Sequence, residues 1–458
     1  MIVAVLLRVY EVFRFPFEQD ELYTIDEATN LFHTRLLPGI QARPVFFLLE
    51  HPFLSLTSAP SAPYLRLLPL IFGVAGVWVT WRLARDLAGP VAGFMALVLV
   101  TISPWHLYAS GFARYYSLLY LLAALVYWQL PRAIDGDRAR WYLTVLVPLF
   151  LGTWTHPSFV FPMIGVALAA SLFPPTGGVS FHWPTRTAWI WLWGPFLGLS
   201  VVVLVAMRIL HHSADVANGG DRGLLATLRL VPAMVDWMTL LVAASAVAGV
   251  VLLARSGSGS ARRFGWMAVF GCVFTLVALF ALSFRTSIYA DYGIAALPLV
   301  LVAAAFPIAW LAENLSPNVA QFGANSIAWI LVIGILPSTF SHLSDGTRFD
   351  YRPALAQINT TGASLEVLAW PIAIQRAYDP ALKSRELPTS AGGLDSALKR
   401  YQDLWAIVSV KRYGIVGDDT GEMAQWLRQN CRQKGEYQRP RLDYRIYRVD
   451  LWRCTAGA

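Results

Sequence analysis

The sequence predicts a polytopic α-helical membrane protein that ends in a small α/β domain. Of its 458 residues, 56% are hydrophobic and only 14% are charged, whereas a soluble domain carries about 25% charged residues. Apolar runs approach the roughly 20 residues that a helix needs to cross a bilayer, and they fill most of the chain up to residue 340. All four lysines lie in the last quarter of the chain (Lys383, Lys399, Lys411 and Lys434), which marks that part as a different kind of structure.

The net charge of +8 does not indicate nucleic-acid binding, because the arginines lie in short loops between apolar runs, where membrane topology accounts for them. The three cysteines form no CxxC pair, so no zinc or redox framework is visible. His211, His212 and Asp215 fit a solvated loop better than a metal site. We therefore expect no resident cofactor; a divalent metal is possible, but nothing in the sequence indicates one.

About eleven membrane helices are expected in a domain that covers residues 1–340. The first run is short for a span, so it is either a truncated helix or, less favoured because no small-residue cleavage site precedes the acidic cluster, a signal peptide. The candidate ranges are 1–13, 63–83, 91–110, 114–131, 141–155, 157–173, 187–209, 232–254, 264–284, 290–312 and 325–340.

The segment 44–56 decides the topology. It is short for a span and contains Glu50, His51 and Pro52. If it is an interfacial helix, the arginine-rich loops near residues 82–85, 132–140, 186 and 255–263 all fall on the cytoplasmic side, as the positive-inside rule prefers. We therefore expect the outer face to carry loop 14–62, the turns Ser110–Arg114 and Thr155–His156, loop 211–231 and the stretch Arg285–Asp291.

Residues 341–458 contain no apolar run long enough to span a bilayer, and we expect them to form an extracytoplasmic α/β domain. "SLEVLAW" and "DLWAIVSV" are typical of buried strands, "GEMAQWLRQN" of an amphipathic helix, and "DYRIYRVDLWR" of an edge or half-buried strand. Cys431 and Cys454 both lie in this domain. An oxidising compartment would allow them to pair, but the sequence does not show that they meet.

The stretch "FEQDELYTIDEATN" (17–30) contains five carboxylates just after the first apolar run. Glu18, Asp26 and Glu27 are expected to be solvated loop residues. Asp20 and Glu21 differ because they precede Tyr23 at the expected membrane surface. A partly desolvated carboxylate there can serve as a general base for a hydroxyl acceptor.

Two cations on the expected outer face are candidates for binding an anion. Arg114 opens a span against the positive-inside bias, and a guanidinium can hold a phosphate bidentately. The alternative is that Arg114 snorkels while Tyr115 and Tyr116 form an interfacial belt. His156 lies at a turn between two spans, where an ionisable residue suggests function, but it could equally be a surface histidine.

The chain resembles a known family in six features. An acidic pair is followed by an aromatic residue after the first span; then come "LRLLPLIFGVAGVWVTWRLARDLAG" and "SPWHLYASGFARYYSLLYLL", a Thr155-His156 turn, and "YGIAALPLVLVAAA" before a terminal domain that opens with "DYRPALAQI". This pattern resembles the GT-C superfamily of polyprenyl-phosphate-sugar-dependent glycosyltransferases, and within it the bacterial members related to protein O-mannosyltransferases and lipid A aminoarabinose transferases. The most specific part is 63–122.

The resemblance implies a GT-C fold and an inverting sugar transfer from a polyprenyl-phosphate carrier on the outer leaflet. The acidic residue of the first outer loop corresponds to Asp20, with Glu21 beside it. The chain departs from the family in three places: it lacks an acidic residue before Ala113-Arg114, it has Ala42-Arg43-Pro44 where many relatives have His-Pro-Pro, and it has Asp291 before Tyr292 where many have Arg. These departures could mean an altered substrate, a different acid/base layout or lost activity.

The expected function is transfer of a sugar from a polyprenyl-phosphate donor to a hydroxyl of a glycan, lipid or protein. Arg114 is the favoured phosphate anchor, followed by His156, with Arg43, Tyr115 and Arg285 also in reach, and Phe46, Phe47 and Phe53 against the prenyl chain. Membrane lipids are the other partners, and the bacterial inner membrane is the expected location, with the active site facing the periplasm. The alternative is a transporter or flippase, which is disfavoured because the chain has no internal repeat and its acidic cluster lies at a membrane surface.

Overall fold

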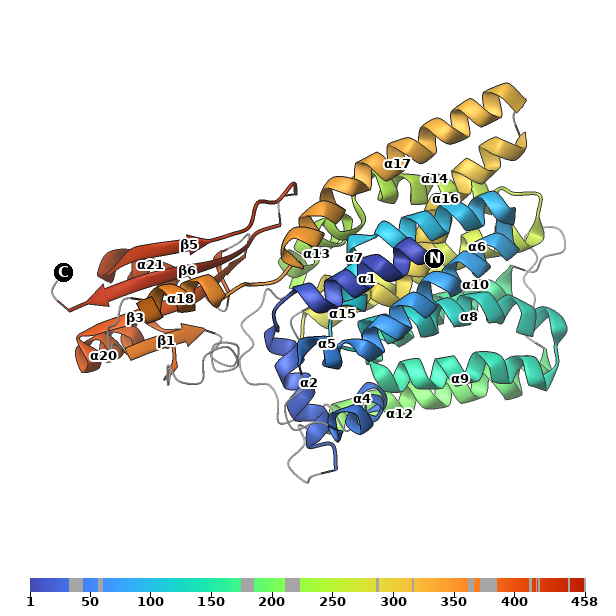
Figure 1. Ribbon diagram of the computed structural model, residues 1–458. Coiled ribbons are helices and arrows are strands. Elements are labelled where there is room, and N and C mark those ends of the chain that lie inside the picture. The colour runs from blue at the N-terminus through green and yellow to red at the C-terminus, as the bar shows by residue number, and fades with distance from the viewer. Residues whose placement is uncertain are drawn as a thin grey trace. The chain divides into compact units, whose positions relative to one another are not determined.

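A computed structural model describes the chain except for residues 33–43, 57–60, 174–184, 211–222, 286–287, 315–316, 361–365, 371–384, 412–413, 417, 419–420, 444 and 457–458. The described residues form two compact units (Figure 1). The first takes Met1–Phe13 and the described residues from Thr24 to Thr339, and the second takes Arg14–Tyr23 and the described residues from Phe340 onwards.

The first unit is helical. Its elements are α1 (Ile2–Arg14), α2 (Gln19–Thr29), α4 (Val45–Leu54), α5 (Ala62–Leu65), α6 (Leu67–Ile102), α7 (Pro104–Ser110), α8 (Tyr116–Gly136), α9 (Ala139–Thr155), η1 (Pro157–Phe159), α10 (Val160–Leu172), α11 (Arg186–Ala188), η2 (Trp189–Trp193), α12 (Gly194–Leu210), α13 (Gly223–Met238), α14 (Leu240–Ala254), α15 (Gly259–Ser283), η4 (Ala290–Ala296), α16 (Leu297–Asn314) and α17 (Pro317–Asp345). Both α2 and α17 continue into the second unit.

Helices long and apolar enough to cross a membrane make the chain a multi-pass membrane protein. Among the described residues there are five such helices, or six if the bent pair α13–α14 counts as one span. Each of the eleven ranges expected from the sequence overlaps a helix, but the expected count of about eleven spans is not confirmed. Several of these helices, such as α1 with 13 residues, are shorter than the roughly 20 residues that a full crossing needs.

The longest helix, α6, consists of two arms that the sequence separates. Ala88 and Gly89 leave the helical conformation, Gly89 with φ +78°, and Pro90 follows. A proline cannot donate the helical hydrogen bond, and a left-handed φ is accessible to glycine without strain. The two arms correspond to the expected ranges 63–83 and 91–110.

Ion pairs identify one end of the helical unit. Arg132 is paired with Asp86 at 2.7 Å and Arg263 with Asp135 at 2.8 Å, so the turns expected to be cytoplasmic lie together. Asp135 is near the end of α8, whose 21 residues extend about 30 Å from Tyr116. The other end of α8 therefore carries the turn Ser110–Arg114, which was expected to face outward.

The described residues of the second unit form a six-stranded mixed sheet with helices on both faces. Its elements are α18 (Arg352–Thr360), β1 (Glu366–Trp370), β2 (Arg385–Glu386), α20 (Ala391–Tyr401), β3 (Asp403–Lys411), β4 (Gly414–Ile415), α21 (Glu422–Asn430), β5 (Cys431–Tyr437) and β6 (Tyr447–Thr455). The strand order is β2-β1-β3-β6-β5, with β4 paired to β3. β1 runs parallel to β2 and β3, whereas β6 is antiparallel to both β3 and β5.

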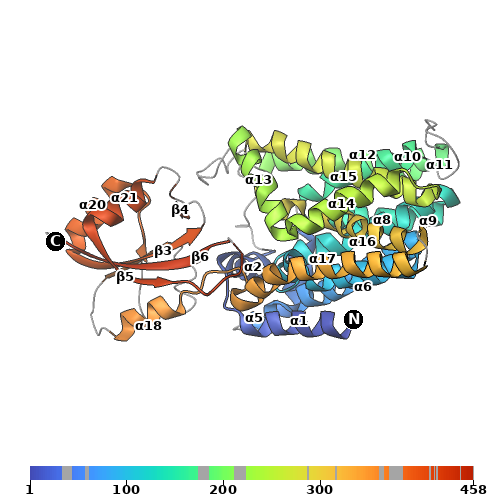
Figure 2. The ribbon, with the colours of Figure 1, turned by 90° about the horizontal axis from the view of Figure 1, so that it is seen from above.

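Successive side chains of β3 point to opposite faces of the sheet and belong to two hydrophobic cores. Trp405 and Ile407 pack with Leu355 of α18 on one face, whereas Ala406 packs with Leu427 of α21 on the other. Figure 2 shows α18 on one side of the sheet and α20 and α21 on the opposite side. The three-layer arrangement confirms the expected α/β domain, because a strand that buries both faces must alternate between two apolar layers.

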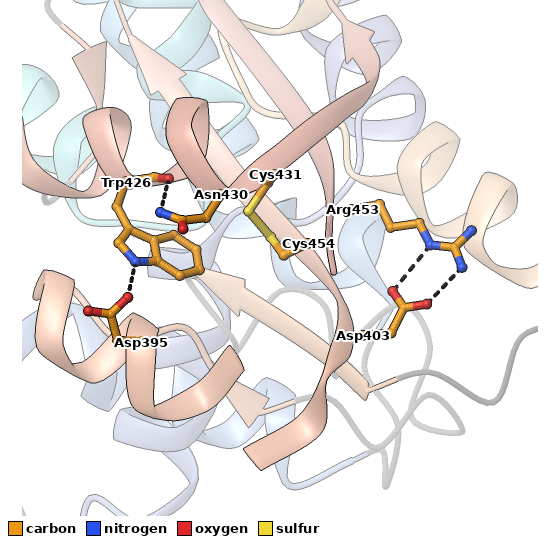
Figure 3. The surroundings of a disulfide bond; sticks show 7 residues. All are labelled: Asp395, Asp403, Trp426, Asn430, Cys431, Arg453 and Cys454. Carbon is orange, nitrogen blue, oxygen red and sulfur yellow. Dashed lines mark hydrogen bonds and ion pairs between the residues drawn. A yellow bond between two sulfur atoms is a disulfide. The ribbon is translucent and has the colours of Figure 1, made fainter. Parts of the chain in front are cut away.

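The sequence alone left the pairing of Cys431 and Cys454 open; the structure joins them in a disulfide between β5 and β6 (Figure 3). Beside it, Arg453 holds Asp403 in an ion pair at 2.7 Å, and Trp426 donates to Asp395 at 2.6 Å. Of the two readings of "DYRIYRVDLWR", the half-buried strand is right and the edge strand is wrong, because β6 has a partner on each side.

Candidate active site

A buried ion pair lies at the end of the helical unit where α8 begins. Arg114 Nη1 is 3.0 Å from Glu27 Oε2 and 3.3 Å from Thr24 Oγ1. The side chains of Arg114 and Glu27 are only 9% and 8% exposed. The expectation that Glu27 is a solvated loop carboxylate is therefore wrong: residues 19–29 form a helix, and Glu27 is on its buried face.

The turn that carries Arg114 is shaped by its sequence. Ser103 caps α7 by accepting a hydrogen bond from the His106 N–H, and Gly111 ends that helix. A Cβ on Gly111 would lie 2.7 Å from Cδ of Glu11, so a glycine is needed for the two segments to approach. The carboxylate of Glu11, on α1 and fully buried, therefore lies against the same turn in which the sequence lacks an acidic residue before Ala113-Arg114.

Stacked rings continue the site from Arg114 towards two other turns. The Tyr115 ring stacks on His156 with centroids 4.7 Å apart, and His156 lies 5.2 Å from the ring of Tyr292. His156 begins η1 by accepting from the Ser158 N–H, with its Nδ1 2.8 Å from Ser158 Oγ. The Arg114 guanidinium lies 5.4 Å from the Tyr115 ring, a cation–π distance. The structure therefore brings together Arg114, Tyr115 and His156, three of the residues predicted to bind the donor.

The short helix α4 covers this group of rings. Phe46 meets Tyr115 edge-on at 6.4 Å, and both Phe46 and Phe47 are fully buried. These two rings therefore pack inside the unit and do not offer the lipid-facing surface that the sequence suggested.

Glu50 is one helical turn after Phe46 on α4 and is only 1% exposed, and no group among the described residues donates a hydrogen bond to its Oε1. Burial raises the pKa of Glu50 to about 8. The side chain is thus a neutral carboxylic acid near neutral pH, and a neutral acid can donate a proton or a hydrogen bond.

The two predicted catalytic carboxylates have different surroundings. Glu21 is fully buried, accepts from the Glu18 N–H at 3.0 Å and lies 3.7 Å from Arg348. A glutamate three residues into a helix that reaches back to the residue before it is a helix cap, so Glu21 stabilises the start of α2. Asp20 is half-buried on the same turn.

The other two carboxylates of the acidic stretch, Asp26 and Glu18, also differ in their exposure to solvent. Asp26 is exposed and accepts from Asn30, as expected for a solvated residue. Burial raises the pKa of Glu18 to about 7, against the nearby Lys411 and Arg348, and its Oε2 is buried. The expectation of a solvated Glu18 is therefore wrong.

Two predicted residues do not join this group. Arg285 is exposed just after α15, and Arg43 lies outside the described residues, as do His211, His212 and Asp215. Within the part of the chain that the structure describes, no three His, Cys, Asp or Glu side chains gather in a way that could hold a metal ion.

Sequence reasoning missed Glu27, Glu11 and Glu50 as members of the site. The partner of Arg114 lies 87 residues away in the sequence, a separation at which local pattern carries no information. A helical reading of "QDELYTIDEAT" was the available signal, because it places Thr24 and Glu27 three residues apart on one face.

The chain has the fold of solved GT-C glycosyltransferases, which is the fold expected from the sequence. No family model matches the chain, and neither does any curated protein sequence. The likeness is therefore structural.

Two groups of solved structures carry this assignment. ArnT from Cupriavidus metallidurans bound to undecaprenyl phosphate aligns with a TM-score of 0.54 at 14% identity, over 100% of this chain and 97% of ArnT. Its apo state gives 0.53 at 14% identity, over 98% and 96%. The Archaeoglobus fulgidus oligosaccharyltransferase tethered with an acceptor peptide gives 0.50 at 13% identity, over 97% of this chain and 73% of that enzyme. At such identities the match establishes a common fold, and it does so along nearly the whole chain.

Proposed function

We propose that the chain is a glycosyltransferase that moves a sugar from a polyprenyl-phosphate donor to a hydroxyl acceptor, with inversion at the anomeric carbon. The observation that carries the proposal is the buried Arg114, fixed by Glu27 beside the rings of Tyr115 and His156 at one end of a membrane bundle. A cation held in this way can bind a lipid phosphate at the membrane surface.

The reaction needs two things from the protein. The acceptor oxygen attacks the anomeric carbon, its proton passes to a base, and the bond from that carbon to the phosphate oxygen breaks with its electron pair going to the phosphate. Phosphate is already a good leaving group, so a strong general acid is not required. The protein must anchor the phosphate and orient the acceptor hydroxyl, and Arg114 and His156 are proposed for the first of these tasks.

Asp20 is proposed as the base. It lies in the first turn of α2, in the acidic stretch to which the sequence resemblance assigns the base. Asp20 is half-buried, whereas Glu21 is engaged in capping α2 and in its ion pair with Arg348. Glu21 therefore supports the position of Asp20 in this proposal.

Solved structures of the same fold support a lipid-linked donor. The Cupriavidus ArnT was solved with undecaprenyl phosphate bound, and the Archaeoglobus oligosaccharyltransferase with an acceptor peptide tethered to it. Both belong to the GT-C class in which the chain's fold falls. We propose the same kind of donor here, with a glycan, lipid or protein as acceptor, and the proposed chemistry requires no resident cofactor.

The proposed location is a bacterial inner membrane with the site facing the periplasm. The Cys431–Cys454 disulfide supports an oxidising compartment for the second unit, and arginines concentrate at the opposite end of the bundle from Arg114. A transporter is not favoured, because its ionisable groups would be expected near the midplane of the bundle on broken helices.

The test is transfer by the purified chain in detergent, supplied with a panel of radiolabelled polyprenyl-phosphate sugars. Asp20→Asn is compared with Asp26→Asn, a matched control on the same helix whose carboxylate is exposed. Turnover that is lost only in Asp20→Asn supports the class and the base. Turnover that survives in Asp20→Asn refutes the base, and a folded wild type that transfers no sugar refutes the class.

A further inference from the structure

The second unit contains a cavity of about 200 Å³ beside the start of α18 and the end of β5. Charged and aromatic side chains line it, and all of them belong to this unit. The cavity is smaller than the roughly 300–1,000 Å³ of pockets that enclose drug-sized ligands, so its volume suits one sugar ring better than an extended chain.

The charges that line the cavity are mixed in sign. Asp345, Asp350 and Glu436 contribute three carboxylates, and Arg348 and Arg439 contribute two guanidinium groups. Each carboxylate is paired with an arginine: Asp345 with Arg441, Asp350 with Arg439 at 2.9 Å, and Glu436 with Arg448 at 3.1 Å. The lining therefore carries no excess of either charge and favours a ligand that is not strongly anionic. A hydroxyl group both donates and accepts, so a polyhydroxylated ligand can use the carboxylates and the guanidinium groups together.

These groups are held in place by one another. Arg439 donates to Asp350 at 2.9 Å and to the carbonyl of Ser344 at 2.8 Å, and Arg352 donates to Asp350 at 2.7 Å. Burial works to raise the pKa of Asp350, but the hydrogen bonds and charge from Arg352 and Arg439 outweigh it and hold that pKa below its ordinary value. The carboxylate therefore stays ionised and fixed. Its two oxygens already accept four hydrogen bonds from Arg352 and Arg439, so its role is to hold the Arg439 guanidinium at the cavity wall.

Two tyrosines give the cavity its apolar surface. Tyr437, at the end of β5, donates its hydroxyl to Gln357, and the Tyr447 ring packs 5.3 Å from that of Phe349. An aromatic ring with a polar tip can pack against the C–H face of a sugar ring while neighbouring groups bind its hydroxyls.

We infer that this cavity binds one neutral or amino-substituted sugar residue of a glycan acceptor. The inference rests on the proposed glycosyl transfer for the word acceptor, but the binding of a sugar can be measured without it.

The test is binding of methyl glycosides to the full chain in lipid nanodiscs, measured by ligand-observed NMR. The probes are a neutral hexoside, an aminohexoside, a hexuronate glycoside and inorganic phosphate. Gln438→Trp introduces a bulky ring at an exposed residue that lines the cavity. Gln433→Trp makes the same change at an exposed residue of β5 that does not line it, and serves as the matched control.

We expect the neutral or amino glycoside to bind the wild type and Gln433→Trp, with at least about tenfold weaker binding to Gln438→Trp, a loss of about 1.4 kcal/mol. Absence of glycoside binding, preference for the hexuronate or phosphate, or unchanged binding to Gln438→Trp would each overturn the inference. Turnover of the lipid-linked donor with a panel of hydroxyl acceptors, measured on the same preparation, separates the two proposals. Turnover without glycoside binding removes only the cavity inference, whereas glycoside binding without donor turnover removes only the proposed reaction.

Discussion

Removal of one partner from the Arg114–Glu27 pair should destabilise the helical unit, whereas removal of both should not. At 3.0 Å and an effective dielectric constant of about 20, the attraction between the two charges is about 5 kcal/mol. Both side chains are less than a tenth exposed, so Arg114→Ala leaves a buried carboxylate uncompensated, at a cost of about 3–5 kcal/mol. The double variant Arg114→Leu with Glu27→Leu removes both charges and should stay close to the wild type in stability.

The same variants separate a structural role for Arg114 from a role in binding. Thermal unfolding in detergent reports stability, and binding of undecaprenyl phosphate reports the anchor. We expect the double variant to unfold near the wild-type temperature but to lose lipid-phosphate binding. Arg132→Ala is the matched control, because its pair with Asp86 is 38% and 26% exposed and should be worth at most about 1 kcal/mol. Unchanged lipid-phosphate binding by the double variant would refute the anchor, and a double variant as unstable as Arg114→Ala would refute the electrostatic account.

Three further predictions concern Glu50, Gly111 and Cys431. Burial raises the pKa of Glu50 from its ordinary value of 4.5 to about 8, so the folded state binds the Glu50 proton more tightly than the unfolded state does. The free energy of unfolding should therefore fall by at most about 5 kcal/mol as the pH rises from 4.5 to about 8. Glu50→Gln should flatten the pH dependence of the thermal midpoint. Gly111→Ala places a methyl group against the Glu11 carboxylate and should lower the free energy of unfolding by about 1–3 kcal/mol. In a Glu11→Ala background the same substitution should cost much less. Additive losses of the two substitutions in thermal unfolding would contradict a contact between residues 11 and 111. Cys431→Ser removes a disulfide with a sequence separation of 23 residues and should lower the stability of the second unit by about 3 kcal/mol. The variant should be more sensitive to protease, as the wild type should be after reduction. Equal protease sensitivity of the variant and the unreduced wild type would show that the bond is absent.

The positions of the helices could be predicted from the sequence because each follows a run of apolar residues. The number of spans could not, since runs such as residues 1–13 and 157–173 are short for a crossing and composition does not say which of them cross. In the second unit, the buried strands around Ala369 and Ile407 were predicted from their apolar pattern. Strand β5 was missed because "CRQKGEY" is polar and is a strand only through its pairing with β6.

The candidate site was predicted only in part, for a physical reason. The turns that carry Arg114 and His156 were expected on one face of the membrane because arginine-rich loops fixed the other face. The partner of Arg114 could not be predicted, because opposite charges 87 residues apart meet only once the helices pack. If residues 19–29 had been predicted as a helix, Glu27 would have been predicted to be buried.

The most direct test of the central claim asks what happens to the bond between sugar and phosphate. The purified chain is reconstituted in liposomes with a radiolabelled polyprenyl-phosphate sugar and a hydroxyl acceptor, and the lipid and glycoside products are identified by mass spectrometry and NMR. A glycosyltransferase of the proposed kind releases polyprenyl phosphate and forms a glycoside of inverted anomeric configuration. An intact donor that has moved to the other leaflet would instead identify a transporter and contradict the account.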